Sequence, residues 1–202
     1  MRPPMFIGSS DATVASVVVF WVVLYAWVGT EVFLGSRRRR LSAGATDYDS
    51  GSKWWLIGSV WASVAIGMWV AFLVPSTAIR SGRIEWFVVG LALMVAGMVL
   101  RWYSIWVLGT SFTCEVSTRP GQEVVEAGPY RWIRHPSYTG GLITVLGVLV
   151  CCVNWLSFPA LIVVLAGYAY RIRIEERALA RDLGTPYRDY MRRTKRLIPF
   201  LV

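Results

Sequence analysis

The segment Trp54–Val74, WWLIGSVWASVAIGMWVAFLV, contains no charged residue and decides the fold class. The hydrocarbon core of a bilayer is about 30 Å thick, and roughly 20 apolar helical residues are needed to cross it. Two further segments have a comparable length and character: Thr13–Leu34 before it and Trp86–Leu108 after it. The sequence therefore predicts three N-terminal transmembrane helices within residues 1–108.

A fourth apolar region, Thr139–Tyr170, is interrupted by Asn154 and Pro159. It is too long for one straight span and somewhat short for two. We interpret it as a tight helical hairpin that turns at about Cys152–Pro159. The expected fold is an all-α polytopic membrane protein with five transmembrane helices, and four spans are the alternative.

The composition agrees with a membrane protein and disfavours other classes. Hydrophobic residues make up 55% of the chain and charged residues 16%, against about 25% charged residues in soluble domains. The net charge of +9 is concentrated between apolar segments, which does not favour a nucleic-acid-binding face. The single histidine, His135, and three cysteines without metal-ligand spacing disfavour a metal centre.

The distribution of basic residues predicts the orientation. With five spans, the basic groups within residues 37–53, 119–134 and 171–196 lie on one side of the membrane. The positive-inside rule then places the N-terminus outside and the C-terminus in the cytoplasm, at the plasma membrane if the source is prokaryotic. We expect residues 109–202 to form the second part of a single membrane-embedded catalytic unit: a cytoplasmic loop, the hairpin and a helical tail that stops and restarts near Gly184.

The segment Gly128–Gly140, GPYRWIRHPSYTG, lies where the cytoplasmic loop re-enters the membrane. Pro136 suits the first turn of a helix, and the free amides of such a turn can hold an anion. The alternative is an interfacial anchor made of basic and aromatic residues. From the local residues alone, both interpretations stay open.

Two further features place ionisable residues near the cytoplasmic ends of spans. Arg171 and Glu175 are four residues apart, so they share a helical face and either form a simple ion pair or line a site. Arg101 either extends toward the interface or offers a fixed positive charge to an anionic group, with Glu31 as a candidate partner.

The order of these motifs is more specific than each of them alone. From about Arg101 to the C-terminus, the chain has Arg-His-Pro-x-Tyr-x-Gly, an apolar hairpin, Arg-x-x-x-Glu-Glu, Leu-Gly-x-x-Tyr-x-x-Tyr and Arg-Leu-Ile-Pro. This order resembles the isoprenylcysteine carboxyl methyltransferase family. Membrane phospholipid methyltransferases and sterol-reductase-like proteins have a weaker version of the same pattern.

The resemblance implies that S-adenosylmethionine binds between the loop and the Arg-His-Pro segment, under a cap formed by the C-terminal helix. The contacts that it implies for this cofactor are Gln122, Glu123, Val124, Val125, Tyr130, His135, Pro136, Ser137, Tyr138 and Glu175. It also implies that Arg171 faces the substrate. Residues 122–125 match the family only by position, as Gly-x-x-x-Val.

Methyl transfer from a sulfonium requires orientation and charge placement more than acid–base groups. A carboxylate acceptor is already ionised at neutral pH and needs a cation, for which Arg171 and Arg101 are candidates. An amine acceptor needs a proton acceptor, which leaves Glu176 or Glu175. We therefore expect methylation at oxygen or sulfur, with nitrogen as an alternative.

The position of the site at the bilayer boundary predicts a lipophilic or lipidated acceptor that enters from the surrounding lipids. An NADPH-dependent reductase of the sterol-reductase type and a non-catalytic membrane protein are the competing interpretations. Neither a nucleic acid nor a metal is expected as a partner.

Overall fold

The computed structural model describes residues 10–39, 46–47, 51–109, 117–118 and 124–198. The longer helices are α1 (Ser10–Arg39), α2 (Ser52–Leu73), α3 (Arg83–Leu108), α4 (Pro136–Cys151), α5 (Leu161–Asp182) and α6 (Thr185–Arg193). Short 3-10 helices are η1 (Pro75–Thr77), η3 (Gly128–Arg131) and η4 (Trp155–Ala160). Two-residue strands, β1 (Thr46–Asp47) and β2 (Ser117–Thr118), pair antiparallel. The predicted helical membrane fold is thereby confirmed, with this strand pair as a small addition.

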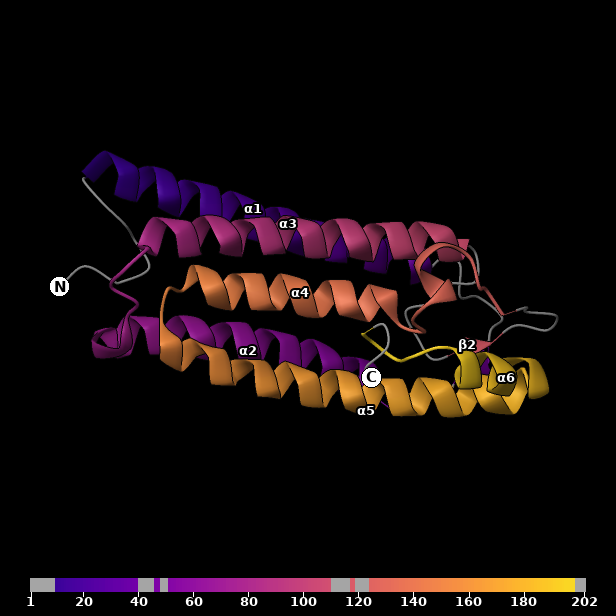
Figure 1. The fold of residues 1–202 in the computed structure, drawn as a ribbon. Coiled ribbons are helices and arrows are strands. Elements are labelled where there is room, and N and C mark those ends of the chain that lie inside the picture. The colour runs from indigo at the N-terminus through magenta and orange to yellow at the C-terminus, as the bar shows by residue number, and fades with distance from the viewer. Residues whose placement is uncertain (1–9, 40–45, 48–50, 110–116, 119–123, 199–202) are drawn as a thin grey trace.

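The helix α4 occupies the centre of the bundle (Figure 1). It packs along α3 on one side and against α2 and α5 on the other, while α1 packs on α3. Its side chains are correspondingly buried, and Val145, Val148 and Leu149 have no exposed surface. The element that opens with the Arg-His-Pro motif is therefore the core helix of the protein.

Among the described residues, four helices are long and apolar enough to cross a membrane, and α4 is a shorter apolar helix. At 16 residues, α4 is about 24 Å long, which is less than the thickness of the hydrocarbon core. Because neighbouring helices enclose it, its length does not have to match the lipid. The predicted hairpin is confirmed, although its first helix begins at Pro136 rather than near Thr139.

Glycines let α3 and α4 approach until their backbones touch. Gly90 and Gly97 on α3 face Gly147 and Gly140 on α4, respectively. A Cβ atom added at Gly97 would lie 2.5 Å from the backbone nitrogen of Thr144 and 2.6 Å from the carbonyl oxygen of Gly140. Small residues at such spacing are typical of helix pairs within membranes, where close van der Waals packing replaces the hydrophobic effect.

The hairpin turn is held by the side chain of Asn154. Its Oδ1 accepts hydrogen bonds from the Leu156 amide (2.9 Å) and the Thr77 hydroxyl (2.8 Å), and its Nδ2 donates to the carbonyl of Val74 (3.0 Å). Asn154 thus satisfies backbone groups of the turn and joins it to the connection between α2 and α3. This arrangement explains why a polar residue interrupts the apolar region at this point.

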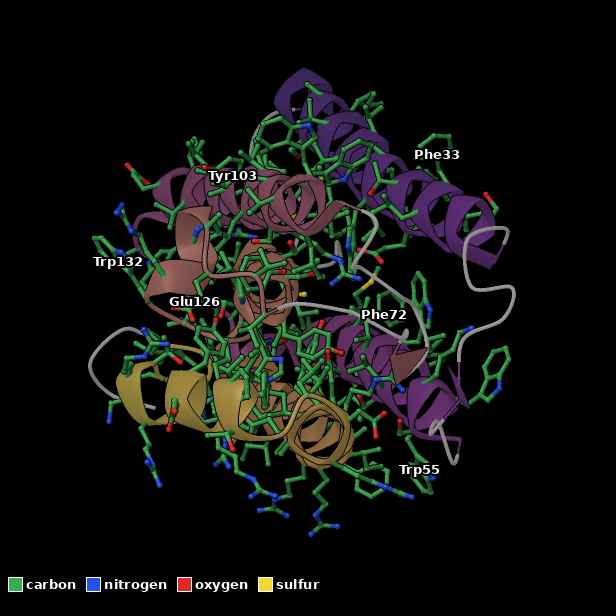
Figure 2. All side chains as sticks on the ribbon, turned by 90° about the vertical axis from the view of Figure 1, so that its right-hand side faces the viewer. Phe33, Trp55, Phe72, Tyr103, Glu126 and Trp132 are labelled. Carbon is green, nitrogen blue, oxygen red and sulfur yellow. The ribbon has the colours of Figure 1, made fainter. Side chains whose placement is uncertain are left out.

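The predicted stop and restart in the tail is also confirmed, because α5 ends at Asp182 and α6 begins at Thr185. Tyr187 and Tyr190 are the buried residues of α6, and the Tyr190 hydroxyl donates to the carbonyl of Tyr130 at 2.6 Å. Burial raises the pKa of the Tyr190 phenol above its usual value, so the hydroxyl remains a donor. Figure 2 looks onto this end and shows nitrogen-tipped side chains projecting from α5 and α6 away from the bundle.

Candidate methyl-transfer site

The Arg-His-Pro motif forms the entry into α4. His135 is the residue directly before the helix and Pro136 is its first residue, as the proline preference for a first turn predicts. The ring of His135 stacks on Tyr138, with ring centroids 5.4 Å apart and an angle of 8° between the planes. The start of α4 therefore presents an imidazole and a phenol side by side.

A C-terminal segment fixes this entry from the side. The amide of Arg134 donates to the carbonyl of Lys195 (2.7 Å), and the amide of His135 donates to the carbonyl of Arg196 (3.0 Å). The hydroxyl of Thr139 donates to the carbonyl of Leu197 at 2.7 Å. The amides of Arg134 and His135, which precede α4, are thus bound to the chain itself.

Glu176 lies at the centre of a charged cluster beneath the motif. Its Oε1 accepts from Nε of Arg134 (2.8 Å), its Oε2 accepts from Nε of Arg196 (3.0 Å), and its side chain is 5% exposed. Nε2 of His135 lies 3.4 Å from Oε1 of the same carboxylate. Two cations therefore hold a buried anion, and this network joins α4, α5 and the C-terminal segment.

His135 retains one unusual property within this cluster. Its side chain is 4% exposed, and Nε2 has no well-aligned hydrogen-bond partner among the residues that the structure describes. The nearest acceptor described for Nε2 is Oε1 of Glu176, so the ring of His135 lies between this carboxylate and the ring of Tyr138.

A second polar chain runs from α4 through α5 to α2. The hydroxyl of Tyr138 donates to Oε2 of Glu175 (2.6 Å), and Nε of Arg171 lies 3.5 Å from the same hydroxyl. Nη1 of Arg171 donates to Oγ of Ser52 at 2.6 Å, at the start of α2. Arg171 is 3% exposed, whereas the side chain of Glu175 is 29% exposed. The chain thus links a buried cation to a more accessible anion through one phenol.

Arg101 forms a third polar group with the partner expected for it. Its Nε and Nη2 donate to the two carboxylate oxygens of Glu31, the latter at 2.7 Å, and Nη1 donates to Oγ (3.0 Å) and the carbonyl (3.2 Å) of Ser137. The interaction with Glu31 confirms the predicted partner. The contact with Ser137 brings this group to the second residue of α4.

The remaining implied cofactor contacts lie near the same entry or outside the described residues. Tyr130 is buried in η3, and Val124 and Val125 are half-buried just before it. Gln122 and Glu123 lie outside the residues that the structure describes. Across the described ranges, no group of three or more His, Cys, Asp or Glu residues could hold a metal ion.

The sequence was then compared with known proteins. Residues 89–181 match the profile of the "Isoprenylcysteine carboxyl methyltransferase (ICMT) family". The resemblance to this family is confirmed. The matching range contains α4, most of α3 and nearly all of α5, so it includes Arg101, Arg134, Tyr138, Arg171 and Glu176, whereas Glu31, Ser52 and Arg196 lie outside it.

Relatives with this family's name include proteins from animals, plants and yeast. Protein-S-isoprenylcysteine O-methyltransferase from Tribolium castaneum is 33% identical over 146 residues, which are 68% of this chain and 50% of that protein. Protein-S-isoprenylcysteine O-methyltransferase B from Arabidopsis thaliana is 36% identical over 115 residues, which are 55% of this chain and 58% of that protein. The matched part of the chain thus spans 50–58% of the length of these two relatives.

A solved structure gives the same likeness in three dimensions. The eukaryotic intramembrane Ras methyltransferase ICMT superposes with a TM-score of 0.55 and 29% sequence identity. The superposition covers 72% of this chain and 51% of that chain. The bundle described above is therefore an integral membrane fold of the ICMT type.

Several residues of the site had no assigned role in the sequence. Arg134 and Arg196 lie within the motifs that indicated the ICMT family, but neither was identified as a partner of Glu176. Ser52 gave no signal, because it is part of no recognisable motif and lies outside the range that matches the ICMT family. A hydroxyl residue at a helix start is usually a cap, and only the packing of α2 on α5 brings Ser52 to Arg171.

Proposed function

We propose that this chain is an S-adenosylmethionine-dependent methyltransferase that esterifies a carboxylate of a lipophilic acceptor within the membrane. The observation that carries the proposal is the polar chain from Arg171 through Tyr138 to Glu175, beside the stacked ring of His135. It gathers a cation, an aromatic pair and a partly exposed anion at one end of apolar helices. The family match supports the same class of reaction.

These residue types fit the proposed cofactor. S-adenosylmethionine supplies a methyl group on a sulfonium, which is already activated for transfer. The partly exposed Glu175 is suited to its ammonium or ribose hydroxyls, and the imidazole of His135, stacked on Tyr138, is suited to another of its polar atoms. The ring of Tyr138 is suited to the sulfonium, through a cation–π contact of about 0.5–2 kcal/mol.

The charges favour a carboxylate acceptor over an amine. A carboxylate, with a reference pKa of about 4, is ionised at neutral pH and needs only a cation to orient it, and the buried Arg171 is suited to this role. An amine would need a proton acceptor. Both oxygens of Glu176 are held by arginines, so Glu176 is poorly suited to accept a proton.

The acceptor is proposed to be lipophilic because the site lies at the end of membrane-crossing helices. Its apolar tail enters from the bilayer, while the polar donor enters from the aqueous side. We place that side in the cytoplasm, with the N-terminus outside, because exposed arginines cluster on α5 and α6. The relatives' names specify an S-isoprenylcysteine carboxylate, which makes a lipidated acceptor the first substrate to examine.

Thermal unfolding of the purified full chain tests this proposal. S-adenosylhomocysteine, the product form of the cofactor, is expected to raise the melting temperature, because a ligand at 100 times its Kd stabilises a protein by about 2.7 kcal/mol. NADPH at the same concentration is the control and is expected to have no effect. Stabilisation by NADPH alone would support a reductase, and no effect of S-adenosylhomocysteine would contradict the proposal.

A further inference from the structure

A polar connection crosses the bundle from α1 to the start of α4. It consists of Glu31 on α1, Arg101 on α3 and Ser137 on α4, which are joined only through the guanidinium of Arg101 in the contacts described above. Most of the outward face of α1 is exposed, and this helix packs along α3 rather than against α4. Through this connection, the outer helix α1 is linked by hydrogen bonds to the central helix α4.

The geometry uses every nitrogen of the Arg101 guanidinium. Nε and Nη2 bind the two oxygens of Glu31 side by side, while Nη1 reaches both oxygens of Ser137. This planar, forked geometry is specific to arginine, because lysine is a single point donor. Since Glu31 compensates the charge of Arg101, the pair is neutral where it lies in the apolar bundle.

The steric contacts of α3 and α4 converge on the same place. A Cβ atom at Gly140 would lie 2.7 Å from the backbone nitrogen of Arg101, so the two helices touch at this level. Ser137 is the residue directly before Tyr138 and two residues after His135. Whatever holds Ser137 therefore also sets the position of the stacked pair, His135 and Tyr138.

We propose that Glu31 and Arg101 are positioning residues: through Ser137, they hold the first turn of α4 in the arrangement that binds the methyl donor. This inference rests on the proposed function. It assigns Arg101 to the support of the donor site, with its charge satisfied by Glu31, in place of direct contact with the acceptor.

Calorimetric titration with S-adenosylhomocysteine tests the inference without an acceptor. Glu31→Gln and Ser137→Ala are each expected to weaken binding about tenfold while the number of sites per chain remains unchanged. If Glu31 acts through Ser137, the two effects are not independent. The loss of affinity in the double variant is then expected to be much smaller than the product of the losses in the two single variants. The inference would be overturned if Glu31→Gln left Kd unchanged. It would also be overturned if the loss of affinity in the double variant equalled the product of the two single losses.

Two further variants separate positioning from loss of fold. Arg101→Lys keeps the charges at positions 31 and 101 but removes the forked guanidinium, so it is expected to weaken S-adenosylhomocysteine binding about tenfold as well. This variant tests the inference even if Glu31→Gln folds poorly. Ser104→Ala on α3 is the control, because among the described residues its hydroxyl bonds within that helix, to the carbonyl of Leu100 at 2.6 Å. A purely structural role for Arg101 would lower the number of sites and leave Kd unchanged. If the wild-type chain binds no S-adenosylhomocysteine, the proposed function itself fails.

Discussion

At the residue scale, Arg101 and Arg171 are both arginines at the ends of apolar helices, but their surroundings differ. Arg101 has a carboxylate partner, Glu31. The contacts resolved for Arg171 include the neutral hydroxyls of Ser52 and Tyr138. Arg171 lies on α5 beside Tyr138 and Ser52, whereas Arg101 also contacts Ser137 at the start of α4. We therefore propose separate roles, in which Arg171 orients the acceptor and Arg101 supports the donor.

Replacement of Arg171 by Ala tests this separation. Donor binding, measured by titration with S-adenosylhomocysteine, is expected to change little, whereas methyl transfer to an S-prenylated cysteine acceptor is expected to fall by about 10²–10³-fold. Arg173→Ala, at an exposed position on the same helix, is the control and should retain activity. Equal losses of binding and turnover in Arg171→Ala would refute the assignment.

Much of the site could be predicted at this scale, and the missing part has a physical cause. His135, Tyr138 and Glu175 lie within motifs, so their proximity was foreseen from the family pattern. The contact between Arg171 and Ser52 spans 119 positions in the sequence. It depends on how α2 packs on α5, and no local pattern of polarity encodes that packing.

At the element scale, the close contact of α3 and α4 predicts a specific sensitivity to added atoms. Gly97→Ala is expected to destabilise the protein by about 1–3 kcal/mol, because its Cβ would overlap backbone atoms of α4. Gly58→Ala on α2 is the matched control: nothing lies within 4 Å of its added Cβ, so no loss of stability is expected. Thermal melting in detergent measures both, and equal stability of the two variants would contradict the close contact.

Hydropathy located the apolar helices well, but it did not locate their exact beginnings. The third span was expected from Trp86 and begins at Arg83, because a charged first turn is compatible with a helix that enters the interface. The backbone hydrogen bonds between residues 195–196 and the Arg-His-Pro motif were not predicted. That segment pairs through backbone groups, which leave no mark on side-chain periodicity.

At the scale of the whole molecule, the orientation across the membrane is testable with cysteine labels. Arg192 is 81% exposed on α6, and Ser76 is exposed on η1 at the opposite end of the bundle. In a chain with Cys114 replaced by Ser, Ser76→Cys is expected to react with an impermeant maleimide on intact cells. Arg192→Cys is expected to react only after permeabilisation, and the reverse pattern would invert the proposed topology. Cys151 and Cys152 are buried and provide an internal background control.

The glycine contact between α3 and α4 restricts how the proposed lipophilic acceptor can reach the site. Where two helix backbones leave no room for a single methyl group, a hydrocarbon tail cannot pass between them. The boundary between α3 and α4 is therefore closed to lipid tails, and the proposed acceptor has to enter between other helices of the bundle.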